Sequence, residues 1–114
     1  MDKDFRKING GNNNDYRLER IGETLVVKLS GELDHHLSAE LRDALDREIN
    51  IHDIKNIIFD FGDVNFMDSS GIGMIMGRYK LIKAKGGKVM VIRPQKQVDR
   101  ILEMSGIKKI LECG

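Results

Sequence analysis

The sequence feature that most constrains the fold is a succession of short apolar runs, each followed by a helical pattern. The runs at residues 24–30, 56–61 and 88–92 are rich in β-branched or aromatic side chains, which is typical of buried strands. Between the last two runs, apolar residues recur at helical spacing on one face, at Ile72, Ile75, Met76, Tyr79 and Ile82. Strands that alternate with helices in this way build a sheet from right-handed strand-helix-strand units.

Two more segments complete the predicted sheet. Residues 16–20 alternate in polarity and lead into the turn signal Gly22-Glu23, so this segment and the run at 24–30 are expected to form a hairpin. A weaker strand pattern covers residues 107–111. The expected fold is therefore α/β, with a mixed sheet of four to five strands and helices packed mainly on one face.

The polar residues that open the chain contrast with this pattern. Residues 1–15 contain a Gly-Gly-Asn-Asn-Asn run and few apolar side chains, so we expect a flexible lead there. A single folded domain is then expected over residues 16–114, which is long enough to bury one core.

The charge balance and the lack of long apolar runs limit the possible partners and locations. The chain has 19 Lys and Arg against 18 Asp and Glu, a net charge of +1, which predicts no nucleic-acid partner and no attraction to an acidic membrane surface. No apolar run approaches the roughly 20 residues that a membrane-spanning helix needs, and the first residues lack the apolar core of a signal peptide. The lone Cys113 cannot form an internal disulfide. We therefore expect a cytoplasmic protein.

The histidines do not suggest a metal site. His35 and His36 are adjacent, so in a helix their side chains point about 100° apart and do not face one ion together. His52 lies at the far end of the same predicted helix. Neither a metal nor a cofactor is expected.

Two polar turns are expected at the carboxyl edge of the sheet. Asp34 precedes a helix whose leucines recur every four residues, so we expect it to be the N-cap of that helix. Ser69 and Ser70 lie where the pattern of the run at 56–61 gives way to the next helix, and one of them is expected at or beside its N-cap. Loops after parallel strands emerge at one edge, which would bring Asp34, Ser69 and Pro94 onto one surface.

Familiar serine and phosphate chemistry does not fit the segment Met67-Asp68-Ser69-Ser70-Gly71-Ile72-Gly73. Neither serine has a glycine two residues before it, so the nucleophile-elbow pattern of serine hydrolases is absent. No Gly-Lys-Ser/Thr follows the strand, and the two glycines are too few for a dinucleotide fingerprint. A helix N-terminus still attracts anions, so a binding domain for a small anionic ligand is an alternative.

Three stretches carry a resemblance to a known family. Residues 31–36 (Gly-Glu-Leu-Asp-His-His), 66–71 (Phe-Met-Asp-Ser-Ser-Gly) and 77–80 (Gly-Arg-Tyr-Lys) resemble the anti-sigma factor antagonists of the STAS domain family, and the likeness extends over residues 16–111. Within that family, the double histidine and the Gly-Arg-Tyr-Lys run are most similar to antagonists that act in sporulation. The resemblance implies the STAS fold and a regulatory protein that is not an enzyme.

The resemblance also implies a phosphorylation switch. Ser69 would be phosphorylated by the anti-sigma factor, a serine kinase with bound nucleotide, and a serine phosphatase would restore it. The unphosphorylated chain, monomeric when free, would bind that kinase and release the sporulation sigma factor. A scaffold subunit of a larger signalling assembly is an alternative, because STAS domains also build such complexes.

Further residues around Ser69 are assigned to partner binding. Asp68 either caps the helix or orients the Ser69 hydroxyl toward the kinase. Ser70 either satisfies free N–H groups of the helix or is itself the acceptor of the phosphate, if the match to the family motif is shifted by one residue. Gly71 and Gly73 would keep the first turn narrow, so that a partner can approach the backbone closely. The other predicted contacts are Asp34, His35, His36, Met67 and Met74.

Overall fold

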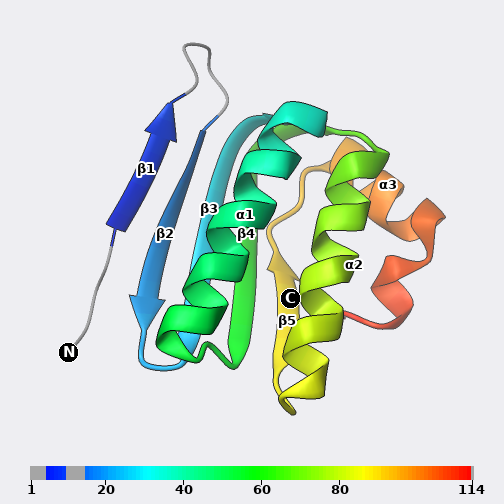
Figure 1. Ribbon diagram of the computed structural model, residues 1–114. Helices are drawn as coiled ribbons and strands as arrows, with labels where there is room; N and C mark the ends of the chain where they lie inside the picture. The colour runs from blue at the N-terminus through cyan, green and yellow to red at the C-terminus, as the bar shows by residue number, and fades with distance from the viewer. Residues whose placement is uncertain (1–4, 10–14, 114) are drawn as a thin grey trace.

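The described part of the chain folds into one sheet with helices packed against it (Figure 1). The structure is a computed structural model and describes residues 5–9 and 15–113. Its elements are, in chain order, β1 (Phe5–Asn9), β2 (Asp15–Ile21), β3 (Thr24–Leu33), α1 (His35–His52), β4 (Asn56–Met67), α2 (Ser69–Ala84), β5 (Lys88–Ile92), α3 (Lys96–Ser105), the 3-10 turn η1 (Ile107–Lys109) and β6 (Glu112–Cys113).

The sheet is mixed, and the spatial order of its strands follows the sequence from β1 to β6. Strands β1, β2 and β3 pair antiparallel, whereas β3, β4, β5 and β6 pair parallel. In the parallel part a helix connects each strand to the next, which confirms the predicted α/β class. The described residues form six strands, more than the four to five expected.

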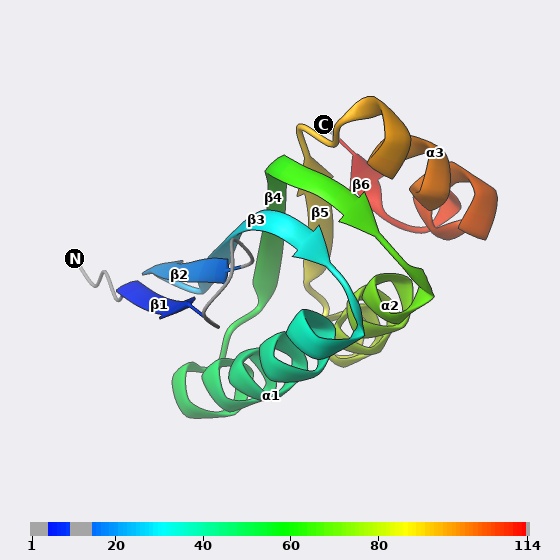
Figure 2. The ribbon, with the colours of Figure 1, turned by 90° about the horizontal axis from the view of Figure 1, so that it is seen from above.

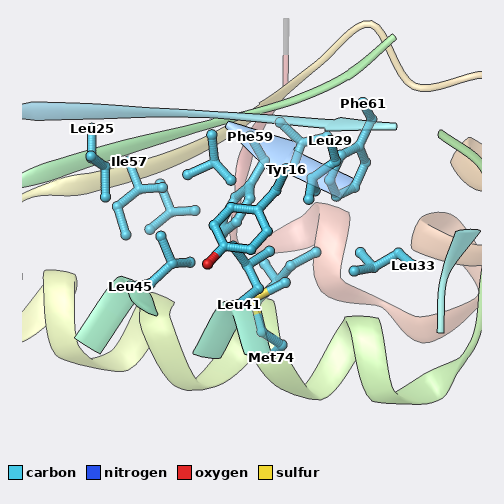
Figure 3. Close-up of a cluster of buried hydrophobic side chains, with 14 of the residues drawn as sticks. Tyr16, Leu25, Leu29, Leu33, Leu41, Leu45, Ile57, Phe59, Phe61 and Met74 are labelled. Atoms are coloured by element: carbon cyan, nitrogen blue, oxygen red, sulfur yellow. The ribbon is translucent and has the colours of Figure 1, made fainter. Parts of the chain in front are cut away.

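Helices α1 and α2 lie side by side over one face of the sheet, as predicted, and α3 lies farther along, beside β4 and β6 (Figures 1 and 2). The core fills the space between the sheet and the two helices. In Figure 3, sheet residues such as Leu29 and Phe59 point toward Leu41 and Leu45 of α1 and toward Met74 of α2, and all five are buried.

The expected flexible lead is wrong for Phe5–Asn9, which form strand β1 and pair with β2 from Phe5↔Glu19 to Asn9↔Asp15. Polar composition suggested a lead, but without β1 the strand β2 would be a free edge with unpaired backbone groups, and pairing satisfies them. Asp15, also counted in the lead, already belongs to β2. The rest of that range, residues 1–4 and 10–14, lies outside the described residues.

Strand β4 is longer than the run at 56–61, because Gly62-Asp63 does not end it. The Asp60 carboxylate accepts a hydrogen bond from the Gly62 N–H at 3.0 Å, and the parallel pairing with β3 resumes after a register shift at Ser30↔Asp63. A glycine in a strand often marks such an irregularity rather than a stop. The two strands then run together to Leu33↔Met67.

The weak strand expected over 107–111 is also wrong. Ile107–Lys109 form a 3-10 turn after Gly106, whose φ of 82° is left-handed, and the strand comes later as β6. Ile107 and Leu111 are buried, but Lys109 between them is exposed, so the burial does not alternate as it does along a strand.

Candidate functional site at the start of α2

Helix α2 begins with an aspartate cap rather than a serine cap. Asp68 is the N-cap, and its Oδ1 accepts a hydrogen bond from the Ser70 N–H at 2.9 Å. The Asp68 carbonyl accepts from the Gly71 N–H at 3.0 Å. The capping alternative for Asp68 is therefore confirmed. Ser70 supplies one of the free N–H groups, and its hydroxyl has another contact than the predicted one, because its Oγ lies 3.2 Å from the His35 Nδ1.

The cap of α1 is the predicted Asp34, whose Oδ1 accepts from the Leu37 N–H at 2.9 Å. Because β3 and β4 end together at Leu33↔Met67, the two capped helices start side by side, with the Asp68 N–H donating to the Leu33 carbonyl at 3.3 Å. The predicted common edge thus holds for Asp34 and Ser69. It does not extend to Pro94, because β5 ends beside Asp60, well before the end of β4.

The two serines face different surfaces. Ser69 is exposed and lines an apolar groove, whereas Ser70 is half-buried and its Oγ lies 3.2 Å from the His35 Nδ1 in a cleft between α1 and α2. This separation follows from helix geometry, in which consecutive side chains project about 100° apart. The Ser69 groove, as we name it, is lined by Met67, Asp68, Ser69, Ile72, Ile101, Met104 and Ser105.

The predicted partner contacts divide into surface and core residues. His35 and His36 are exposed, and the His36 Nε2 lies 3.3 Å from the Glu40 Oε1. Met67 and Met74 are only 1% and 4% exposed, although Met67 lines the Ser69 groove and Met74 lines the cleft between α1 and α2. Apolar side chains at the end of a strand and on the inner face of a helix are drawn into the core by their own burial.

The two glycines after the serines have different roles. A Cβ on Gly71 would lie 2.7 Å from the Met67 Cγ and 3.1 Å from the Leu33 Cδ2, so this position is glycine because the core leaves no room for a side chain. A Cβ on Gly73 would meet nothing within 4 Å. Only Gly73 therefore fits the prediction of a backbone that a partner can approach.

Sequence reasoning missed the far wall of the Ser69 groove, which α3 provides through Ile101 and Met104. Met104 is 80% exposed, although its helix is otherwise amphipathic. The helical spacing of Val98, Ile101 and Leu102 predicts a helix in this region. Its position beside Ser69 depends on the extension of β4, which no local pattern indicated.

An ion pair fixes the turn that leads into α3. The Arg93 guanidinium donates two hydrogen bonds to the Asp60 carboxylate, at 3.1 and 2.9 Å, and lies over Gly62. Burial raises the pKa of the Asp60 carboxyl, but the hydrogen bonds from Arg93 and from the Gly62 N–H outweigh it, so this pKa lies below its ordinary value of 3.8. Gln95 adds a hydrogen bond from its Nε2 to the Gly62 carbonyl at 3.0 Å. These contacts hold the start of α3 against β4.

Within residues 15–111, no group of three or more His, Cys, Asp and Glu side chains is arranged to hold a metal ion. None of the helices in the described ranges is long and apolar enough to cross a membrane.

Comparison with protein families and curated proteins gives consistent matches. The STAS domain model matches residues 15–113. An anti-sigma F factor antagonist of Paenibacillus polymyxa is 47% identical over 87 residues, covering 76% of this chain and 74% of the relative. An anti-sigma F factor antagonist of Lysinibacillus sphaericus is 32% identical over 93 residues, covering 81% of this chain and 80% of the relative.

Two solved structures extend these matches to the fold. The anti-sigma factor antagonist SpoIIAA in its unphosphorylated form matches with a TM-score of 0.80 at 32% identity, covering 87% of each chain. The Bacillus cell fate determinant SpoIIAA in the phosphorylated form matches with a TM-score of 0.72 at 31% identity, covering 87% of this chain and 90% of that one.

Proposed function

The chain belongs to the STAS domain family, as its sequence resemblance predicted, and on that premise we propose that it is an anti-sigma factor antagonist controlled by phosphorylation of Ser69. Relatives of 47% and 32% identity are described as anti-sigma F factor antagonists. SpoIIAA, whose fold this chain shares, has been solved in both a phosphorylated and an unphosphorylated form. These likenesses support a regulator of this class, and not an enzyme.

The observation that carries the choice of residue is the exposure of Ser69 on the first turn of α2, beside an apolar groove. A kinase must reach the acceptor oxygen, and an exposed hydroxyl with apolar surface next to it offers both access and area for docking. Ser70 lacks this access because its side chain faces the cleft and is hydrogen-bonded to His35.

A phosphate on Ser69 would alter binding far more than folding. It adds about −1.5 to −2 charges. The positive end of α2 would favour it by about 0.3–1 kcal/mol, which repulsion from the neighbouring Asp68 offsets. Against a partner, an imperfectly paired buried charge costs several kcal/mol, and about 4 kcal/mol already corresponds to a thousandfold loss of affinity.

The proposed cycle has two partners. The unphosphorylated chain is a monomer when free. It binds an anti-sigma factor that is a serine kinase with bound nucleotide, and this binding releases the sporulation sigma factor. Phosphorylation of Ser69 ends this binding, and a serine phosphatase restores it. Because these partners act on transcription, the proposal places the chain in the cytoplasm.

Incubation with the anti-sigma factor kinase and ATP, followed by mapping of the phosphate, tests the proposal. We expect labelling of wild type and of Ser70→Ala, and none of Ser69→Ala. Native mass spectrometry should show a complex of the kinase with wild type that Ser69→Asp does not form. Labelling at another residue, or equal binding by Ser69→Asp and wild type, would refute the switch.

A further inference from the structure

A cleft of about 250 Å³, lined by both polar and apolar side chains, lies between α1 and α2, on the side of α2 that faces away from the Ser69 groove. The two helices run in the same direction from a common edge (Figure 1), so residues one or two turns into each helix face each other across the cleft. His35 and Ser70 line it beside the helix starts, and Ser38, Arg42 and Arg78 line it farther along the two helices.

Buried donors in this cleft lack partners. The Arg78 side chain is 10% exposed, and its Nε lies 3.0 Å from the Asp46 Oδ1. Its Nη1 is buried and has no hydrogen-bond partner among the described residues, and neither has the Oγ of Ser38, which is 4% exposed. Native proteins rarely leave buried polar groups unsatisfied, so each such group needs an explanation.

The positive charges in the cleft also repel each other. Burial lowers the pKa of the Arg78 guanidinium, the Asp46 carboxylate opposes this shift, and the nearby charge of Arg42 lowers the pKa further. Arg42 is itself only weakly paired, with its Nε 3.3 Å from the Asp43 Oδ1 at an exposed position. Two guanidinium groups in mutual repulsion, one of them with a free buried donor, are arranged to receive an anion.

We propose that this cleft binds a small tetrahedral oxyanion of the phosphate class, held by the guanidinium groups of Arg42 and Arg78 and by the hydroxyl of Ser38. A guanidinium group presents a planar fork of N–H donors that matches phosphate oxygens, and a serine hydroxyl adds a further donor. Asp43 and Asp46 lie beside the Nε atoms of the two arginines, at 3.3 and 3.0 Å, and the Nη1 of Arg78 is left without a hydrogen-bond partner among the described residues. Because these carboxylates offset part of the positive charge, binding is weak but saturable.

The oxyanion site is independent of the proposed switch. It uses neither Ser69 nor the apolar groove, and it needs no kinase. If Ser69 were not phosphorylated, the proposal of an oxyanion site would be unaffected. If the cleft did not bind phosphate, the proposed switch at Ser69 would be unaffected.

The test is an NMR titration of the full unphosphorylated chain with inorganic phosphate, against sodium chloride at matched ionic strength. We expect saturable shifts at the backbone amides of Ser38, Arg42 and Arg78 and at the arginine Nε–H signals, with phosphate only. Arg42→Gln removes one charge-assisted contact, and we expect its dissociation constant for phosphate to rise about tenfold.

Arg47→Gln is the matched control, because Arg47 is an exposed arginine of α1 that does not line the cleft. Its dissociation constant should equal that of wild type. Arg42 carries the test because its side chain is 54% exposed, whereas Arg78 is part of the buried packing and its replacement endangers folding. Equal shifts with phosphate and chloride, no saturation, or equal dissociation constants in Arg42→Gln and wild type would overturn the proposal.

Discussion

The His35 Nδ1 lies 3.2 Å from the Ser70 Oγ, and this contact joins the first turns of α1 and α2. It holds the second serine of the pair in the interhelix cleft and leaves the first one, Ser69, at the open side of the helix. Two chemically identical neighbours are thereby separated into a structural and an accessible hydroxyl.

The first prediction separates the two serines by stability. Ser70→Ala removes the contact with His35 and should lower the free energy of unfolding by about 1 kcal/mol, the typical worth of one hydrogen bond. Ser69→Ala changes an exposed residue and should alter it by less than about 0.5 kcal/mol. Urea unfolding measures both, and a larger loss in Ser69→Ala than in Ser70→Ala would contradict the assigned roles.

The second prediction compares two glycines of the same helix turn. Gly71→Ala forces a methyl group against Met67 and Leu33 and should destabilise the fold by about 1–3 kcal/mol. Gly73→Ala enters open space and should stabilise the helix by about 0.5–1 kcal/mol. Thermal unfolding of the two variants should therefore move in opposite directions from wild type. A rise in the melting temperature of Gly71→Ala would show that Gly71 is not closely packed, and a fall in that of Gly73→Ala would show that the space around Gly73 is not open.

The third prediction concerns the Ser69 groove as the docking surface for the kinase. Met104→Gln removes an apolar side chain that is 80% exposed, so it should weaken kinase binding with little change in stability. Ile51→Gln is the control, because Ile51 is 65% exposed near the far end of α1, away from the groove. Calorimetric titration with the anti-sigma factor should detect a loss of affinity in the first variant alone. Equal affinities would place the contact elsewhere.

The fourth prediction is a pH dependence. The pKa of Asp60 is lower in the folded chain than its ordinary value, so its ionised form stabilises the fold. This contribution is fully present above the unfolded pKa of about 3.9 and is lost as the pH falls through the lower folded pKa. Asp60→Asn should remove that part of the acid destabilisation and should cost about 1 kcal/mol at neutral pH. Chemical unfolding at neutral and acidic pH measures both effects. If the free energy of unfolding of Asp60→Asn depended on pH as steeply as that of wild type, the assignment would be refuted.

Much of the fold was predictable because it depends on local patterns. The period of the apolar residues identified α1, α2 and the strands between them, and the polar residue before α1 identified Asp34 as its cap. The unpredicted parts depend on partners distant in sequence. Strand β1 forms because β2 needs a neighbour, and β4 continues past Gly62 because β3 runs beside it.

The site was predictable in its position and less so in its details. The strand-helix junction located Ser69 and Ser70, but which serine faces the solvent depends on the register set by the Asp68 cap. Met67 and Met74 were predicted to contact a partner, and the sequence did not show that both side chains are almost fully buried. The groove beside Ser69 was not predicted, because one of its walls is α3, more than 25 residues later in the sequence.

Asp68 alone connects β4 to α2, and it is committed to the cap. The proposed acceptor is thus presented on a rigid corner, and a partner that binds there has no loop to order and no conformational entropy of the chain to overcome. If a kinase binds this corner as proposed, it recognises the folded shape and not a linear motif. A synthetic peptide of residues 64–74 would have the same sequence but would lack the folded corner that presents Ser69. One residue inserted between β4 and α2 would turn a different side chain outward.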